Sequence, residues 1–166
     1  MRVLDSDGFL MCKIQGRIFE KSLDALKCSS PFFIKNYMQG DIARSMDICA
    51  FLNTSISEDR VLYDMRDLSY GSNLYTKEEM YFIGHFYRYV SYIYEIDSKK
   101  LYSLLPSRIL IKYAYTWSLE GPDKVLYEIE KDYHVNLNNE DLLIKTQLNI
   151  SNKLNNIDFI NKSILI

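Results

Sequence analysis

One segment, residues 76–94, constrains the fold more than any other part of the chain. It begins with a capping box, in which Thr76 accepts from the backbone N–H of Glu79 while the Glu79 side chain bonds back to the backbone of Thr76. Apolar and aromatic residues then follow at helical spacing on more than one face, namely Met80, Phe82, Ile83, Phe86, Tyr87, Tyr89, Val90, Ile93 and Tyr94. Such a helix is buried on most sides, either at the centre of the fold or against a partner protein.

Arg88 is the one permanent charge in the middle of this aromatic run. A guanidinium is costly to bury without a partner, so we expect one of three arrangements. It stacks on neighbouring tyrosine rings, pairs with an acid inside the fold, or projects into an acidic site on a partner protein. In the first two cases its loss should lower the melting temperature, and in the third it should remove partner binding alone.

The composition excludes several functional classes. A hydrophobic content of 48% over 166 residues is enough for one domain with a sizeable core. The net charge of −2 provides no overall attraction to nucleic acid or to an anionic membrane. The sequence shows no signal-peptide pattern and no membrane span. Three scattered cysteines fit neither a disulfide framework nor a metal knuckle. We therefore expect a cytoplasmic protein that does not contact membranes.

Helical periodicity and capping signals predict an all-α fold, a compact domain of about six to seven helices. Besides the central helix, the predicted helices cover residues 9–26, 31–39, 41–49, 99–105, 107–117 and 122–133. Residues 60–75 are rich in turn formers and are predicted to be a connecting loop. We expect residues 1–135 to form a single helical domain. Residues 136–166 are rich in Asn and Ile and form either a further amphipathic helix or an arm that orders on a partner.

Acid–base and phosphate-binding chemistry find little support. His85 and His134 are the two histidines of the chain. We interpret His85 as a satisfied packing residue of the aromatic helix, and His134 as a helix-end residue that interacts with the helix dipole. The glycines are isolated, so no phosphate-binding loop exists, and the acidic pairs are spaced as helix-start charges. We expect no catalytic residue, no metal and no cofactor.

Residues 97–106 allow a second interpretation. A tight turn followed by a short helix would present Lys99, Lys100 and Tyr102 as the second helix of a helix-turn-helix-like pair that binds operator DNA. Alternatively, this is a surface helix whose leucines pack inward. The region is charge-balanced, whereas phosphate binding usually needs clustered cations, so the surface helix is the favoured interpretation and a DNA-binding autoregulator the alternative.

Two stretches of the sequence resemble a known group of proteins. The first joins Lys13-Ile-Gln-Gly-Arg-Ile-Phe-Glu-Lys-Ser-Leu with residues 33–47, and the second joins residues 75–89 with Ser98-Lys-Lys-Leu-Tyr-Ser-Leu-Leu-Pro. Together they are similar to small bacterial proteins, common in Firmicutes, that resemble antitoxins encoded beside toxins, some of which resemble ADP-ribosyltransferases. The resemblance covers roughly residues 10–135. The group's Ile-Gly-Tyr-Ile-Tyr-Arg-Tyr core is matched from Ile83, but its Tyr-His-Thr-Leu-Asp-Pro segment is only echoed from Tyr115.

The resemblance implies a non-enzymatic antitoxin-like protein that binds and inhibits a cognate toxin enzyme, and it carries over no catalytic residue. Tyrosine suits such a role, because it supplies contact area at a small entropic cost and keeps a polar tip. The partner-binding residues that we expect are Tyr87, Arg88, Tyr92 and Trp117.

Overall fold

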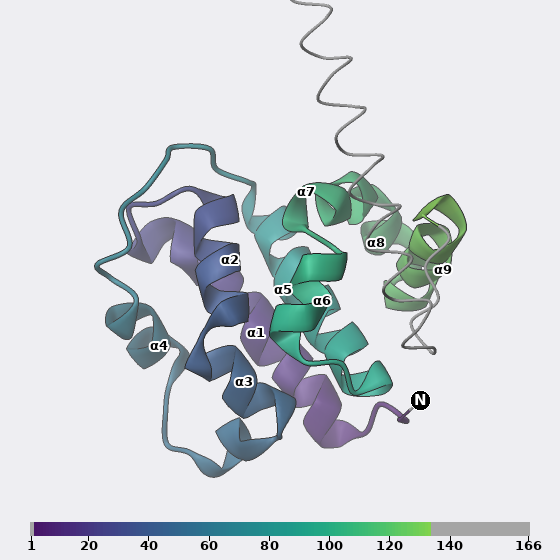
Figure 1. Ribbon diagram of the computed structural model, residues 1–166, viewed down its shortest axis with the longest axis horizontal. Coiled ribbons are helices and arrows are strands. Elements are labelled where there is room, and N and C mark those ends of the chain that lie inside the picture. The colour runs from purple at the N-terminus through teal and green to yellow at the C-terminus, as the bar shows by residue number, and fades with distance from the viewer. Residues whose placement is uncertain (1, 134–166) are drawn as a thin grey trace, which may run out of the picture.

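The structure is a computed structural model that describes residues 2–133 (Figure 1). It confirms the all-α fold, since this range holds nine α-helices, two short 3₁₀ turns and no β-strand. The elements are α1 (Ser6–Ala25), α2 (Ser30–Gln39), α3 (Asp41–Asp47), η1 (Ala50–Asn53), α4 (Glu58–Asp64), α5 (Lys77–Tyr94), α6 (Ser98–Leu104), α7 (Ser107–Leu110), η2 (Ile111–Tyr113), α8 (Ala114–Glu120) and α9 (Pro122–Tyr133). The predictions for His134 and for the segment 136–166 lie outside the described residues.

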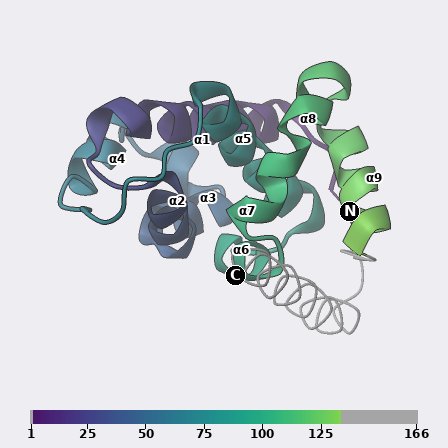
Figure 2. The ribbon, with the colours of Figure 1, turned by 90° about the horizontal axis from the view of Figure 1, so that it is seen from above.

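Helix α5 is the central helix of the fold. The capping box is present: the Glu79 N–H donates to Thr76 Oγ1 at 3.2 Å, and the Thr76 N–H donates to Glu79 Oε2 at 2.7 Å. Every residue from 82 to 93 is buried. Helix α1 lies alongside α5 in both views, with α2–α4 toward one end of the molecule and α8 and α9 toward the other (Figures 1 and 2). The chain itself therefore covers the aromatic helix.

Glycines allow α1 and α5 to approach closely. A Cβ atom on Gly84 would lie 2.7 Å from the Gln15 carbonyl oxygen and 2.8 Å from the Phe19 ring. On the facing helix, a Cβ on Gly16 would lie 2.9 Å from the ring of Tyr81. Because protein interiors are close-packed, only glycine fits at either point without some displacement.

Arg88 is 1% exposed and is held by a buried hydrogen-bond network (Figure 1 shows the four helices that supply it). Its Nε donates to Gln15 Oε1 on α1 at 2.9 Å, and its Nη1 donates to Asp47 Oδ1 on α3 at 2.7 Å. The remaining acceptors are the Ala43 carbonyl, Ser91 Oγ and Ser98 Oγ. Of the three arrangements that the sequence allows, the structure therefore shows pairing with an acid inside the fold.

Asp47 links this hydrogen-bond network to the start of α6. Its Oδ1 accepts from Ser98 Oγ at 2.6 Å, and its Oδ2 accepts from the Ser98 backbone N–H at 2.9 Å. The carboxylate thus satisfies the start of α6 as well as the guanidinium. A buried charge pair contributes to the fold only when its remaining donors and acceptors are satisfied, and this one meets that condition.

Two elements differ from the sequence-based prediction. Residues 58–64, largely within the predicted loop, form α4, which the Ser57 side chain caps by accepting from the Arg60 N–H at 3.2 Å. Val61 and Leu62 are its buried residues, and Arg17 on α1 pairs with Glu58 at 2.5 Å. A helix of two turns with two buried residues leaves no readable periodicity, so tertiary contacts define it. The predicted helix 107–117 is divided into α7, η2 and α8.

We predict that Gly84→Ala destabilises the fold by about 1–3 kcal/mol, because the added methyl group must separate two backbones. Gly16→Ala is the matched control, since its methyl group meets only a tyrosine ring edge and gains helix propensity of up to about 1 kcal/mol. Chemical denaturation of both variants measures the difference. Equal losses of stability would contradict the close-packing argument.

We also predict that Arg88→Ala lowers the free energy of unfolding by about 3–5 kcal/mol, because it leaves Asp47 desolvated and without its counterion. Arg60→Ala is the control: Arg60 is 62% exposed and its pair with Asp64 is an i,i+4 surface pair, worth about 0.5 kcal/mol or less. Thermal and urea unfolding of the two variants would test this. A loss for Arg88→Ala no larger than for the control would show that the network contributes nothing.

Candidate functional site

Three of the four predicted partner-binding residues lie inside the fold. Tyr87 is fully buried and its hydroxyl donates to the Leu105 carbonyl. Tyr92 is 5% exposed and its hydroxyl donates to Asp5 Oδ1 at 2.6 Å. Arg88 belongs to the buried network described above. In the structure these three side chains hold helices together and offer almost no surface to a partner.

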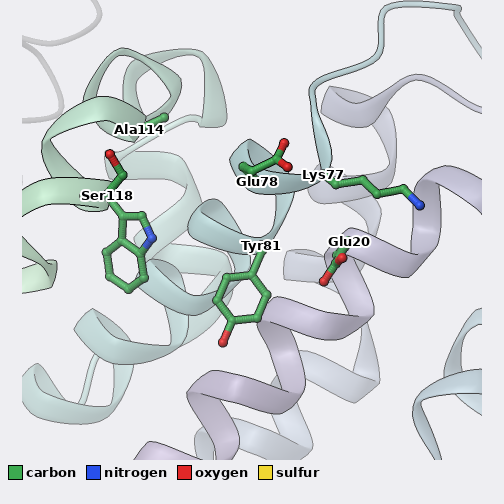
Figure 3. A pocket seen from close by; sticks show the side chains of 7 residues that line it. Glu20, Lys77, Glu78, Tyr81, Ala114 and Ser118 are labelled. Carbon is green, nitrogen blue, oxygen red and sulfur yellow. The ribbon is translucent and has the colours of Figure 1, made fainter.

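The fourth residue, Trp117, lines a surface cleft of about 330 Å³ between α1, the start of α5 and α8, called here the Trp117 cleft. Its lining residues are Glu20, Lys77, Glu78, Tyr81, Ala114, Trp117 and Ser118. Figure 3 shows Tyr81 between Glu20 on α1 and Ser118 on α8. The cleft therefore joins segments that are far apart in the sequence.

Aromatic rings form the wall of the cleft and continue beyond it. The ring centroids of His85 and Trp117 are 4.8 Å apart, and those of Tyr81 and His85 are 5.9 Å apart. The ring centroids of Phe82 and Trp117 are 5.4 Å apart. Phe9, which is 46% exposed, meets the His85 ring edge-on with a centroid distance of 6.5 Å. This chain of contacts fixes the Trp117 side chain on α5 and links the cleft to the exposed Phe9 ring.

His85 is buried behind this wall without a full set of hydrogen bonds. It is 6% exposed, and its Nδ1 atom has no partner among the described residues. Burial, reinforced by the positive charge of Lys13, lowers the pKa of His85 to about 4. The ring packs as the sequence predicts, but it is not a satisfied histidine, because an unpaired buried nitrogen costs free energy.

Of the three charged residues that line the cleft, Lys77 has an ion-pair partner within the described chain, whereas Glu20 and Glu78 do not. Lys77 Nζ lies 2.7 Å from Asp24 Oδ2, and its side chain extends away from Tyr81 (Figure 3). Glu20 and Glu78 have neither a hydrogen bond nor an ion pair within the described chain, and Lys77 acts on them only at longer range. Two carboxylates thus border an aromatic wall with their hydrogen-bonding capacity free.

Helix α8 is the least covered helix of this region. It packs on α5 and α9, yet none of its seven residues is buried. Ala114, Trp117 and Ser118 face the cleft, whereas Tyr115 and Leu119 are 76% and 65% exposed. At 100° per residue, Tyr115 and Leu119 form an apolar stripe adjacent to the cleft-facing side of the helix.

The predicted DNA-binding residues lie on α6, a helix of seven residues. Leu101 and Leu104 point into the core, Lys99 is exposed, and Lys100 and Tyr102 are half-buried. Lys99 shares its surface pocket with the acidic residues Asp41, Asp47 and Asp97. Phosphate binding needs an excess of cations, which this surface does not provide, so the arrangement is that of a surface helix.

Sequence reasoning missed Glu20, Lys77, Glu78 and Tyr81 as members of the site. Two signals point to them. Gly16 marks a place where another side chain approaches α1, and that side chain is Tyr81. The capping box places Lys77 and Glu78 in the first turn of α5, at the surface end of a buried helix.

Within residues 2–133, no helix is both long and apolar enough to span a membrane. The same part of the chain contains no cluster of three or more His, Cys, Asp or Glu side chains arranged to hold a metal ion. Comparisons with protein-family models, with curated proteins and with solved structures find no match to this chain. The resemblance to antitoxin-like proteins therefore stays a prediction.

His85 predicts a pH dependence of stability. Its pKa is about 4 in the folded protein, against 6.5 for an ordinary histidine, so the unfolded chain binds the proton more strongly. The stability contribution is fully present above pH 6.5 and is lost as the pH falls from 6.5 toward 4. Between pH 7 and pH 5 we expect a loss of about 1–2 kcal/mol that His85→Phe removes. Urea unfolding at both pH values measures it, and identical pH profiles for the two proteins would contradict the assignment.

Proposed function

We propose that this protein is a non-enzymatic, antitoxin-like protein that binds a partner protein, a toxin enzyme, through the Trp117 cleft and the apolar stripe of α8. The observation that carries the proposal is the exposure of α8. A helix that belongs only to the core buries one face fully, whereas α8 has no fully buried residue, packs Ala114 and Trp117 on the core only in part, and presents Tyr115 and Leu119 to solvent.

The composition of this surface supports protein binding. Exposed apolar area beside a cleft is typical of interaction sites. A few hot-spot residues provide most of the binding energy in protein interfaces, and these are enriched in Trp, Tyr and Arg and lie in well-packed pockets near the centre of the contact. The surface combines such features, since Trp117 and Tyr81 line a pocket with charged residues at its border, and the exposed Tyr115 and Leu119 lie on the same helix as Trp117.

The contacts of α8 indicate that this surface is held in place before a partner binds. Trp117 is fixed by Phe82 and His85 of α5. On the other side of α8, Thr116 Oγ1 lies 3.1 Å from Glu128 Oε2 on α9. A preorganised surface loses less conformational entropy on binding, which favours a stable complex.

The test is co-expression with the product of the adjacent gene, which the resemblance to antitoxins implies is the toxin. We expect a complex in size-exclusion chromatography with light scattering and inhibition of the toxin activity. Replacing Tyr115 and Leu119 by serine should weaken binding about tenfold or more, because two exposed apolar contacts are lost.

Tyr63→Ser is the matched control. Tyr63 is 55% exposed on α4, at the end of the molecule opposite α8 (Figure 1), so its replacement should leave the affinity unchanged. Absence of both complex and inhibition would refute the proposed function. An equal loss for Tyr63→Ser would place the interface elsewhere on the surface.

A further inference from the structure

The Trp117 cleft combines two features that recognise a positively charged group. Tyr81 and Trp117 supply aromatic faces, which attract cations through the negative potential of the ring. Glu20 and Glu78 supply carboxylates at the border of the same cleft. Together they offer both stacking and ion pairing to one side chain.

The cleft's own lysine does not occupy this position. Lys77 extends from the first turn of α5 toward α1, where Asp24 holds its ammonium group at 2.7 Å (Figure 3). With Lys77 directed away, Glu20 and Glu78 keep their hydrogen-bonding capacity. The described chain therefore leaves a vacant acceptor for a cation from outside.

We infer that the Trp117 cleft receives an arginine side chain of the partner protein, an assignment that rests on the proposed function and specifies its contact chemistry. The guanidinium stacks on Tyr81 or Trp117 and donates to Glu20 and Glu78. Tyr115 and Leu119 then contact apolar residues that flank the arginine.

The geometry favours arginine over lysine and over a neutral side chain. A guanidinium is planar, so it stacks on a ring while its edge donates to carboxylates, whereas an ammonium group forms a compact and strongly hydrated point charge. A neutral side chain would leave two carboxylates desolvated without compensation. The apolar portion of the cleft fits the methylene stem of arginine.

Trp117 makes the inference directly measurable, because it is the only tryptophan of the chain. Acetyl-arginine amide is the probe, and acetyl-citrulline amide, which has the same shape without the charge, is the matched ligand control. Titration of the full chain with the arginine probe should give a saturable change in tryptophan fluorescence. We expect the citrulline compound to bind about tenfold more weakly, and acetyl-lysine amide to lie between the two.

The variant Glu20→Gln with Glu78→Gln should remove the preference for arginine over citrulline. Glu120→Gln is the control, since Glu120 lies on α8 three residues after Trp117 but does not line the cleft. Its preference for arginine should equal that of the wild type. Circular dichroism verifies that each variant remains folded.

The complex with the toxin gives an independent measurement. The double glutamine variant should bind it about tenfold more weakly and with a smaller salt dependence. Equal binding of arginine and citrulline probes, or an unchanged preference in the double variant, would overturn the inference. A toxin complex that ignores both glutamates would also overturn it while leaving the proposed function intact. Selective probe binding without any toxin complex would refute the proposed function alone and support a cleft that accepts arginine from another protein.

Discussion

The buried guanidinium of Arg88 is the interaction on which the arrangement of the helices depends. It bonds to α1 through Gln15, to α3 through Ala43 and Asp47, and to α6 through Ser98, so one side chain of α5 fixes three neighbouring helices. A charge in an apolar interior must be satisfied by acceptors at fixed positions, which defines one register between these helices. The network thus adds directional hydrogen bonds to the close packing of α1 on α5 at Gly16 and Gly84.

Much of this fold could be predicted from the sequence because its strongest signals are local. The capping box at Thr76 and the long aromatic run define α5 without reference to other segments. Helix α4 was missed although Ser57 can cap a helix, since seven residues with two buried side chains show no clear periodicity and the helix is held by packing on α1, which is distant in sequence. The acid that pairs with Arg88 was equally out of reach, because Asp47 lies 41 residues away and looks like any other helix-end carboxylate.

The candidate site was predictable only in part, and for a related reason. The sequence shows which side chains favour a protein interface, and tyrosine, tryptophan and arginine are the residues selected on that basis. It does not show whether they are exposed, and the outcomes diverge within the single helix α5. Tyr81 lines the cleft, whereas Tyr87 donates to Leu105 in the core. Residue type alone could not separate these two tyrosines, because burial follows from where α1, α6 and α8 lie against α5.

Both the Trp117 cleft and the core depend on the packing of α1 against α5. Close approach of α1 at Gly84 and Gly16 brings Glu20 to the border of the cleft and seats the Tyr81 ring on α1. Helix α8 then completes the cleft by packing Trp117 on Phe82 and His85 of α5. The central helix thus carries both the Arg88 network and the rings that support Trp117. In the proposed complex, a partner at α8 would meet a Trp117 ring that Phe82 and His85 already hold in place, so less conformational entropy would be lost on binding.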